Sequence, residues 1–377
     1  MDKTALRHQL RLQRRALVGR AERSRLAIQR LKTLPFWASA RCVLVYANLG
    51  AELETQSLLT DTEKICVVPY CLPGGELGRF RLENREELQP GMFGILEPAV
   101  ELRQKPERTV PLEELDAVVL PGVGFDADGF RLGQGGGYYD RLLEKLSPKT
   151  RTVGLAFACQ MVERLPHEAH DLPVDYVVTE DSVRRFIPKT VGILGGIACG
   201  KSLVSDFLET HGAAVFHADT VGHEALQDPE IQCTLAARWG EEVASSRAAI
   251  AAKVFSQKAE LEFLNKTVHP WILTQWKRFC LTHRHAPLWV LDAPLLLEAG
   301  WGSLCDERLF VDTPLAMRQR FAAERGWTAD ELERRERTQL SLDEKRAAAT
   351  YVLPNSGTAE HLREALETLL PKLERYS

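Results

Sequence analysis

The sequence lacks the signals of several protein classes. Its eight cysteines include no C-x-x-C pair and only Cys66 and Cys71 lie close together, so reduced thiols are expected rather than a zinc site or a disulfide framework. No apolar run approaches the roughly 18 residues of a membrane span, and the chain does not start with the apolar stretch of a secretory signal. We therefore expect a cytoplasmic protein without a membrane partner.

The chain also lacks a large net charge of either sign. The net charge of -4 gives no overall electrostatic reason to expect nucleic acid or an anionic membrane as a partner, so small-molecule substrates are the better expectation. The arginine-rich first thirty residues leave a nucleic-acid-binding helix as an alternative, although no aromatic residues are interleaved there. No feature of the sequence indicates an oligomeric state.

The length of 377 residues favours two domains, each with its own core. Helical spacing of leucines predicts one or two helices over residues 3–34. Strand-like runs occur at 42–46, 65–69, 117–120, 152–156, 190–194, 214–217, 289–291 and 308–311. Their alternation with helical or polar segments predicts two α/β domains with largely parallel sheets. Pro188 interrupts regular structure, so we place the domains at 1–188 and 189–377.

The second half begins with a phosphate-binding motif. The segment Gly195-Gly196-Ile197-Ala198-Cys199-Gly200-Lys201-Ser202 matches G-x-x-x-x-G-K-[ST] between an apolar strand and a helix that starts near Leu203. Glycines let backbone N–H groups turn towards phosphate oxygens, the lysine reaches the β and γ phosphates, and the serine hydroxyl suits magnesium. This half is therefore predicted to bind ATP with Mg²⁺.

Several further sequence segments in this half bear on which molecule accepts the phosphoryl group. They are Gly192–Ile197, His217–Glu224, Val268–Pro270, Ala293–Glu298, Val311–Pro314, Arg325, Arg335 with Gln339, Glu344–Arg346 and Asn355–Gly357. In order and spacing they resemble the dephospho-coenzyme A kinase family. The resemblance implies an adenylate-kinase-like P-loop fold, a three-layer sandwich around a parallel sheet. It also implies that Asp219 is the catalytic base, that Lys201 assists transfer and that residues 195–203 bind ATP with Arg325 and Arg335 in a lid.

Some positions depart from that family's pattern or have an equally good structural explanation. His217 stands where the family has a first aspartate, and Thr350 and Pro354 replace common aspartates. The lid arginines are surrounded by glutamates and equally fit a solvated helix face. His269-Pro270 fits either an acceptor-site element or the boundary of a helix. Another nucleoside-like hydroxyl is the alternative acceptor.

The first half carries a second glycine cluster of a different design. Residues 121–140 include Arg131, Leu132, Gly133, Gln134, Gly135, Gly136, Gly137, Tyr138, Tyr139 and Asp140, with a helical segment directly after them. Such a loop can surround a phosphate with backbone N–H groups. With Lys3-x-x-x-Arg7, 52–55, 94–98 and 167–175, the string resembles 5-formyltetrahydrofolate cyclo-ligase from Lys3 to about Asp181.

That resemblance implies ATP-driven closure of 5-formyltetrahydrofolate to 5,10-methenyltetrahydrofolate. Lys3, Arg7 and residues 131–139 are implied to bind ATP, Asp140 and Asp171 to hold Mg²⁺, and Glu52 and Tyr138 to contact the folate. Gln134 and Gly136 stand where some members have basic residues. A basic helix face would explain Lys3 and Arg7 without function, and a degenerate regulatory module attached to a working kinase is the alternative for this half.

Overall fold

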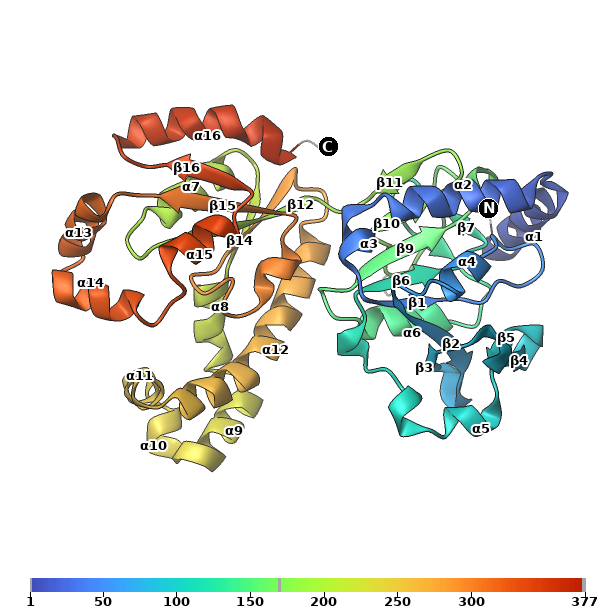
Figure 1. The fold of residues 1–377 in the computed structure, drawn as a ribbon, viewed down its shortest axis with the longest axis horizontal. Coiled ribbons are helices and arrows are strands. Elements are labelled where there is room, and N and C mark those ends of the chain that lie inside the picture. Colours follow the sequence, from blue (N-terminus) through green and yellow to red (C-terminus); the bar gives the residue numbers. More distant parts are fainter. Residues whose placement is uncertain (1, 169–170, 375–377) are drawn as a thin grey trace. The chain divides into compact units, whose positions relative to one another are not determined.

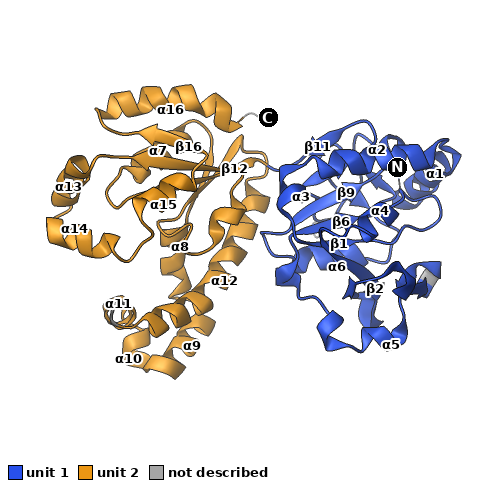
Figure 2. Cartoon of the chain, viewed as in Figure 1, with its two compact units in different colours: residues 1–187 blue, residues 188–377 orange. Residues whose placement is uncertain are grey.

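The computed structural model describes residues 2–168 and 171–374 (Figure 1). The chain divides into two compact units, Met1–Ile187 and Pro188–Ser377 (Figure 2). Both units are α/β, as the alternation of strand and helix patterns predicts. Within the described residues no helix is both long and apolar enough to cross a bilayer.

The first unit is built on a seven-stranded sheet in the order β11-β10-β9-β6-β1-β2-β3. Its strands are β1 (Cys42–Val45), β2 (Ile65–Cys71), β3 (Leu77–Leu82), β6 (Ala117–Leu120), β9 (Arg151–Leu155), β10 (Tyr176–Val178) and β11 (Val183–Arg185). The five inner strands pair in parallel, and β3 and β11 add antiparallel edges. Every residue of β1 and β6 is buried, which explains their uninterrupted apolar sequences.

Two ribbons and several helices complete this unit. The ribbons pair β4 (Leu88–Pro90) with β5 (Leu96–Pro98) and β7 (Gly124–Phe125) with β8 (Arg131–Leu132). The helices are α1 (Lys3–Ala16), α2 (Arg20–Lys32), α3 (Pro35–Ser39), α4 (Gln56–Leu59), α5 (Val100–Arg103) and α6 (Tyr138–Lys145). Leu6 and Leu10 of α1 pack against Val123 and Leu132, so this helix lies against the β7–β8 ribbon. The packing places the arginines of α1 beside the glycine loop that follows β8.

The second unit contains a five-stranded parallel sheet in the order β13-β14-β12-β15-β16. The strands are β12 (Lys189–Gly195), β13 (Ala214–His217), β14 (Leu288–Asp292), β15 (Glu307–Asp312) and β16 (Tyr351–Pro354). The helices are α7 (Lys201–Thr210), α8 (Ala218–Ala225), α9 (Pro229–Trp239), α10 (Glu241–Ala244), α11 (Arg247–Ser256), α12 (Lys258–Thr282), α13 (Leu315–Glu324), α14 (Ala329–Glu336), α15 (Leu342–Ala347) and α16 (Ala359–Glu374). In Figure 1, α7 and α16 lie along one side of the sheet, with α8, α12 and α15 on the other.

His269 and Pro270 lie inside α12, so the interpretation of this pair as a helix boundary is wrong. The proline is accommodated within a helix of 25 residues, and the imidazole packs against Trp301 with ring centroids 5.0 Å apart. The pair therefore belongs to a helix that packs on α8 rather than to a turn.

Candidate functional sites

The phosphate loop of the second unit joins β12 to α7. Gly195 and Gly200 adopt φ values of 154° and 92°, and Ala198 has φ 57°, so the backbone turns in a way that side chains usually prevent. At Gly195 an added Cβ would lie 2.4 Å from the Cys199 sulfur. The glycine spacing is thus needed to bring successive N–H groups to the start of α7, where the helix dipole favours an anion.

Two distant segments hold this loop in place. The Thr313 hydroxyl and the Asn355 amide both donate to the Cys199 carbonyl, at 2.7 and 3.0 Å. Lys201 folds back over the loop and donates to the Gly196 carbonyl at 3.0 Å. The motifs after β15 and β16 therefore support the loop, a role that sequence spacing alone did not reveal.

A second group of polar side chains lies at the carboxyl ends of β13 and β14. The strands pair so that His217 faces Asp292, with Nδ1 and Oδ2 3.4 Å apart, and the Ser205 hydroxyl of α7 donates to the same oxygen at 2.9 Å. Asp219 follows in the first turn of α8. Loss of solvent and the charge of Asp292 raise the pKa of Asp219, while Lys201 opposes the rise.

The two arginines predicted for a lid, Arg325 and Arg335, lie in different settings. Arg325 caps the end of α13. Arg335 on α14 donates to Glu331 at 2.8 Å and lies 4.3 Å over the Trp327 ring, so its charge is already paired. Sequence reasoning missed Arg318, which is buried. Its guanidinium donates to the Thr313 carbonyl at 3.2 Å, pairs with Glu336 and would contact a side chain placed at Gly196, so it lies against the phosphate loop.

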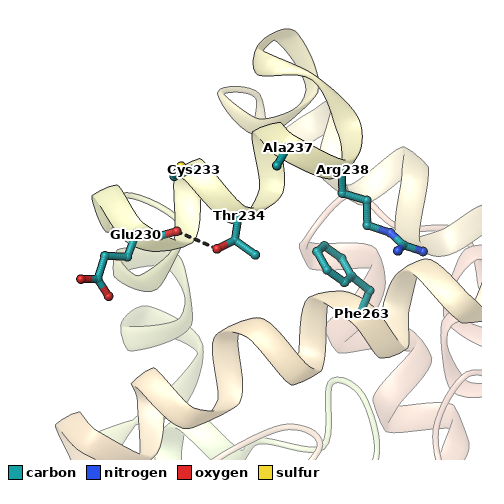
Figure 3. Close-up of a pocket in the computed structure, with 6 residues that line it drawn as sticks. All are labelled: Glu230, Cys233, Thr234, Ala237, Arg238 and Phe263. Atoms are coloured by element: carbon teal, nitrogen blue, oxygen red, sulfur yellow. Dashed lines mark hydrogen bonds between the residues drawn. The ribbon is translucent and has the colours of Figure 1, made fainter.

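Figure 3 shows a separate hollow on the helices α9 and α12. It is lined by Glu230, Cys233, Thr234, Ala237, Arg238 and Phe263. Arg238 lies 4.4 Å over the Phe263 ring and pairs with Glu260 at 2.8 Å, and Thr234 donates to the Glu230 carbonyl at 2.9 Å. These contacts occupy the Arg238 guanidinium and the Thr234 hydroxyl, and none of the lining residues belongs to the phosphate loop.

A cavity of about 630 Å³ occupies the first unit between α1, the end of β2 and the glycine loop before α6. The structure brings most of the predicted site residues to it: Glu52, Arg131, Gly133, Gln134, Gly135, Gly136, Gly137, Tyr138, Tyr139 and Asp140. Gly135 and Gly137 have φ values of 108° and 67° and form the turn that starts α6. The loop thus places backbone N–H groups and a helix N-terminus at the cavity wall.

The charged side chains at this wall form hydrogen bonds or ion pairs within the unit. The Arg131 side chain is only 5% exposed, and its Nη2 lies 2.5 Å from Asp140, whose side chain is 30% exposed. Tyr139 packs beneath the Arg131 guanidinium at 5.5 Å. The Glu52 carboxylate accepts from the Leu49 N–H at 3.1 Å, and burial raises its pKa.

Four predicted residues lie outside the lining of the cavity. Leu132 is buried against α1. Arg7 donates to the Gly133 carbonyl at 2.9 Å, and Lys3 pairs with Asp171 at 3.2 Å. Sequence reasoning instead missed Arg14, which does line the cavity. Among the described residues no three acidic, histidine or cysteine side chains form a metal-binding cluster.

The two halves match two different families. Residues 1–180 match the model of the 5-formyltetrahydrofolate cyclo-ligase family, and residues 189–361 match that of dephospho-CoA kinase. The cyclo-ligase of Escherichia coli K12 is 36% identical over 182 residues, which are 46% of this chain and 98% of that protein. The dephospho-CoA kinase of Deinococcus radiodurans is 36% identical over 193 residues, 50% of this chain and 93% of that protein.

A solved relative matches the first half as well. The NMR structure of Aquifex aeolicus 5,10-methenyltetrahydrofolate synthetase is 38% identical and covers 49% of this chain and 93% of its own, with a TM-score of 0.44. Each curated relative is spanned almost completely by one half of the chain. The chain therefore belongs to both families, as a fusion of a 5-formyltetrahydrofolate cyclo-ligase with a dephospho-CoA kinase.

Proposed function

We propose that each domain, 1–188 and 189–377, carries a complete ATP site and that the residues described above perform both reactions. The observation that carries the kinase assignment is the arrangement of Asp219, Asp292 and Lys201 around one phosphate loop. For the cyclo-ligase it is the cavity that joins Glu52 to the glycine loop. The glycine loop, Arg131 and Asp140 in its lining also favour catalysis over the alternative of a regulatory folate-binding module, because folate binding alone requires no triphosphate or metal contacts.

In the kinase, Asp219 accepts the proton of the ribose 3′-hydroxyl of dephospho-CoA. The freed oxygen attacks the γ-phosphorus of ATP, so that coenzyme A forms and ADP leaves. Lys201 and the loop N–H groups stabilise the charge on the transferred group. Arg318 lies beside the loop as a buried cation paired with Glu336, and Arg325 and Arg335 are the outer cations of the lid.

In the cyclo-ligase, the formyl oxygen of 5-formyltetrahydrofolate attacks the γ-phosphorus of ATP and ADP leaves. A neighbouring ring nitrogen then closes on the activated carbon, and the C–O bond breaks to release phosphate. Arg131 and residues 132–139 hold the triphosphate, with Lys3, Arg7 and Asp171 at its outer edge. Glu52 and Tyr138 contact the folate, and both belong to the cavity lining.

Magnesium fits the donor sets of both sites. Asp140 presents a partly exposed carboxylate at the cavity wall, and Ser202 presents an exposed hydroxyl at the start of α7. Mg²⁺ usually takes one or two protein oxygens and completes its shell with phosphate oxygens and waters, so neither site needs a larger acidic cluster. Asp171, which is paired with Lys3, is the second candidate carboxylate. The ion would neutralise charge on the transferred phosphoryl group.

The bifunctional assignment is tested by ADP release from the purified chain with each acceptor supplied separately. Both dephospho-CoA and 5-formyltetrahydrofolate are expected to give ADP in a 1:1 ratio with product. No folate-dependent ADP, with the kinase active, would instead support the regulatory-module alternative for the first domain.

Asp219→Asn is expected to lower kinase turnover by about 100- to 10,000-fold, because the amide keeps the shape of the side chain but cannot accept the proton. The KM for ATP should change little. Steady-state kinetics with dephospho-CoA measures both quantities, and folate cyclisation by the same preparation serves as the internal control. Near-normal turnover would contradict the role of Asp219.

A further inference from the structure

Arg14 interrupts the apolar face of α1. It follows Leu6 and Leu10 at intervals of four, so its side chain points inward with theirs and is only 9% exposed. The guanidinium donates from Nη1 to the Gly122 carbonyl at 3.3 Å, but Nε is buried without a hydrogen-bond partner in the part of the chain that is described. A buried arginine is costly unless a nearby group compensates it.

The compensating group is Glu52. Nη1 of Arg14 lies 3.9 Å from Oε1 of Glu52, whose side chain is 12% exposed, and both residues line the same cavity. The other oxygen of Glu52 is fixed by the Leu49 N–H at 3.1 Å. The pair therefore connects the inner face of α1 to the carboxylate that we assign to folate binding.

The surroundings of the pair leave its charges weakly solvated. Tyr46 is buried and Tyr139 is partly buried, and both interact electrostatically with Glu52, while the side-chain amide of Gln134 hydrogen-bonds to it. Burial raises the pKa of Glu52, and the charge of Arg14 opposes that rise. Burial also lowers the pKa of Arg14, which faces Tyr46, Arg11 and Cys159 in addition to Glu52.

We propose that Arg14 is a positioning residue of the cyclo-ligase, which keeps Glu52 ionised and oriented so that its carboxylate can accept N–H groups of the reduced pteridine ring. The proposal rests on the proposed role of Glu52 in folate binding. Hydrogen bonds from N–H donors to a carboxylate are about twice as strong as those to a neutral acceptor, so a protonated Glu52 binds the ring less well. Arg14 acts through Glu52 and need not touch the substrate.

The test is the pH dependence of kcat/KM for 5-formyltetrahydrofolate. A cation within about 4–6 Å lowers the pKa of a carboxyl by roughly 1–3 pH units. In Arg14→Met the pKa of Glu52 should therefore rise, and the acidic limb of the profile should move to higher pH by at least about one pH unit. On the acidic limb, at a pH where Glu52 is mostly protonated in both proteins, kcat/KM for the folate should then be about tenfold lower in Arg14→Met than in the wild type. The KM for ATP should stay within about twofold.

Four further variants make the result specific. Arg14→Lys keeps a cation and should return the limb most of the way towards wild type. Glu52→Gln should remove the limb, and adding Arg14→Met to it should cause no further loss of kcat/KM. Arg25→Met removes the arginine of an exposed Arg–Glu pair on α2 and should leave the profile unchanged. The thermal midpoint of folate-cyclising activity records the stability of each variant.

Three outcomes overturn the inference. An unshifted acidic limb in Arg14→Met, with only a lower thermal midpoint, shows that Arg14 is merely structural. Additive losses in the Arg14→Met/Glu52→Gln double variant show that the two residues act separately. If Arg14→Met does not fold, Arg14→Lys provides the test. An acidic limb that moves to higher pH by about one pH unit or more in Arg14→Lys, about the shift predicted for Arg14→Met, contradicts the role of the cation, because lysine keeps the positive charge. A normal KM for folate in Glu52→Gln instead refutes the proposed role of Glu52 itself.

Discussion

The charge of the Asp292 carboxylate affects the pKa of the nearby Asp219. Asp292 ends β14 opposite His217, accepts a hydrogen bond from Ser205, and its charge helps to raise the pKa of Asp219. Asp219 acts as a base only when ionised, so its activity should decline as the pH falls through this raised pKa. His217 also faces Asp292 and so places an imidazole beside this carboxylate.

Asp292→Asn removes one cause of the raised pKa. The pKa of Asp219 should fall, and the acidic limb of the kinase pH profile should therefore move to lower pH, whatever happens to the plateau rate. The measurement is kcat with dephospho-CoA across the acid range. Asp206→Asn, which neutralises an exposed carboxylate on α7, is the matched control and should leave the limb in place. A limb that stays or moves upward in Asp292→Asn would contradict the electrostatic coupling.

The strand β9 packs closely against the ring of Phe125 in the β7–β8 ribbon. Gly154 lies in this central strand, and an added Cβ would come within 2.3 Å of the Phe125 ring, which is fully buried. The glycine therefore lets the β7–β8 ribbon pack on the sheet. Because the ribbon precedes the glycine loop, the packing also positions the wall of the cavity beside that loop.

Gly154→Ala is expected to destabilise the first unit by about 1–3 kcal/mol, because the methyl group overpacks the core. The urea concentration at which folate-cyclising activity is half lost should fall accordingly. Replacing Phe125 by leucine in the same chain should recover part of the loss by relieving the collision. Equal midpoints for wild type and Gly154→Ala would show that the ribbon can move aside freely.

At the scale of the whole molecule, the two ATP sites have unrelated designs. The kinase loop follows β12 and precedes Lys201, whereas the cyclo-ligase loop precedes α6 and is flanked by the paired Arg131 and Asp140. Neither product is the substrate of the other reaction, so the chemistry requires no channelling. We therefore predict that the sites are chemically independent.

Lys201→Ala should nearly abolish phosphorylation of dephospho-CoA, because the cation that bridges the β and γ phosphates is lost. Folate cyclisation should continue at the wild-type rate. Asp140→Ala should have the opposite effect, since it removes the carboxylate that we propose as a magnesium ligand and that pairs with Arg131. Both rates are measured on each purified variant, and each retained activity is the folding control. Loss of both activities in a monodisperse Lys201→Ala protein would contradict independence.

Local sequence determined the parts of this molecule that depend on short-range geometry. The glycine spacing around Lys201 predicts a phosphate loop because only particular backbone angles place successive N–H groups at one anion. Apolar runs likewise predict the buried strands β1, β6 and β12, which the structure contains. The polar edge strand β11 and the antiparallel β3 were not predicted, because edge strands lack the continuous apolar run of a buried parallel strand.

Only the tertiary structure decided which charged side chains enter the sites. Arg14 and Arg318 stand among other arginines in sequence, but each is buried while many of its neighbours are exposed. Arg14 pairs with Glu52 and Arg318 lies against the loop at Gly196, and both contacts join segments that are distant in sequence. The same holds for Asp292 and His217, which meet through the pairing of β13 with β14. Burial and pairing of charges depend on which elements pack together, and a local pattern does not specify that packing.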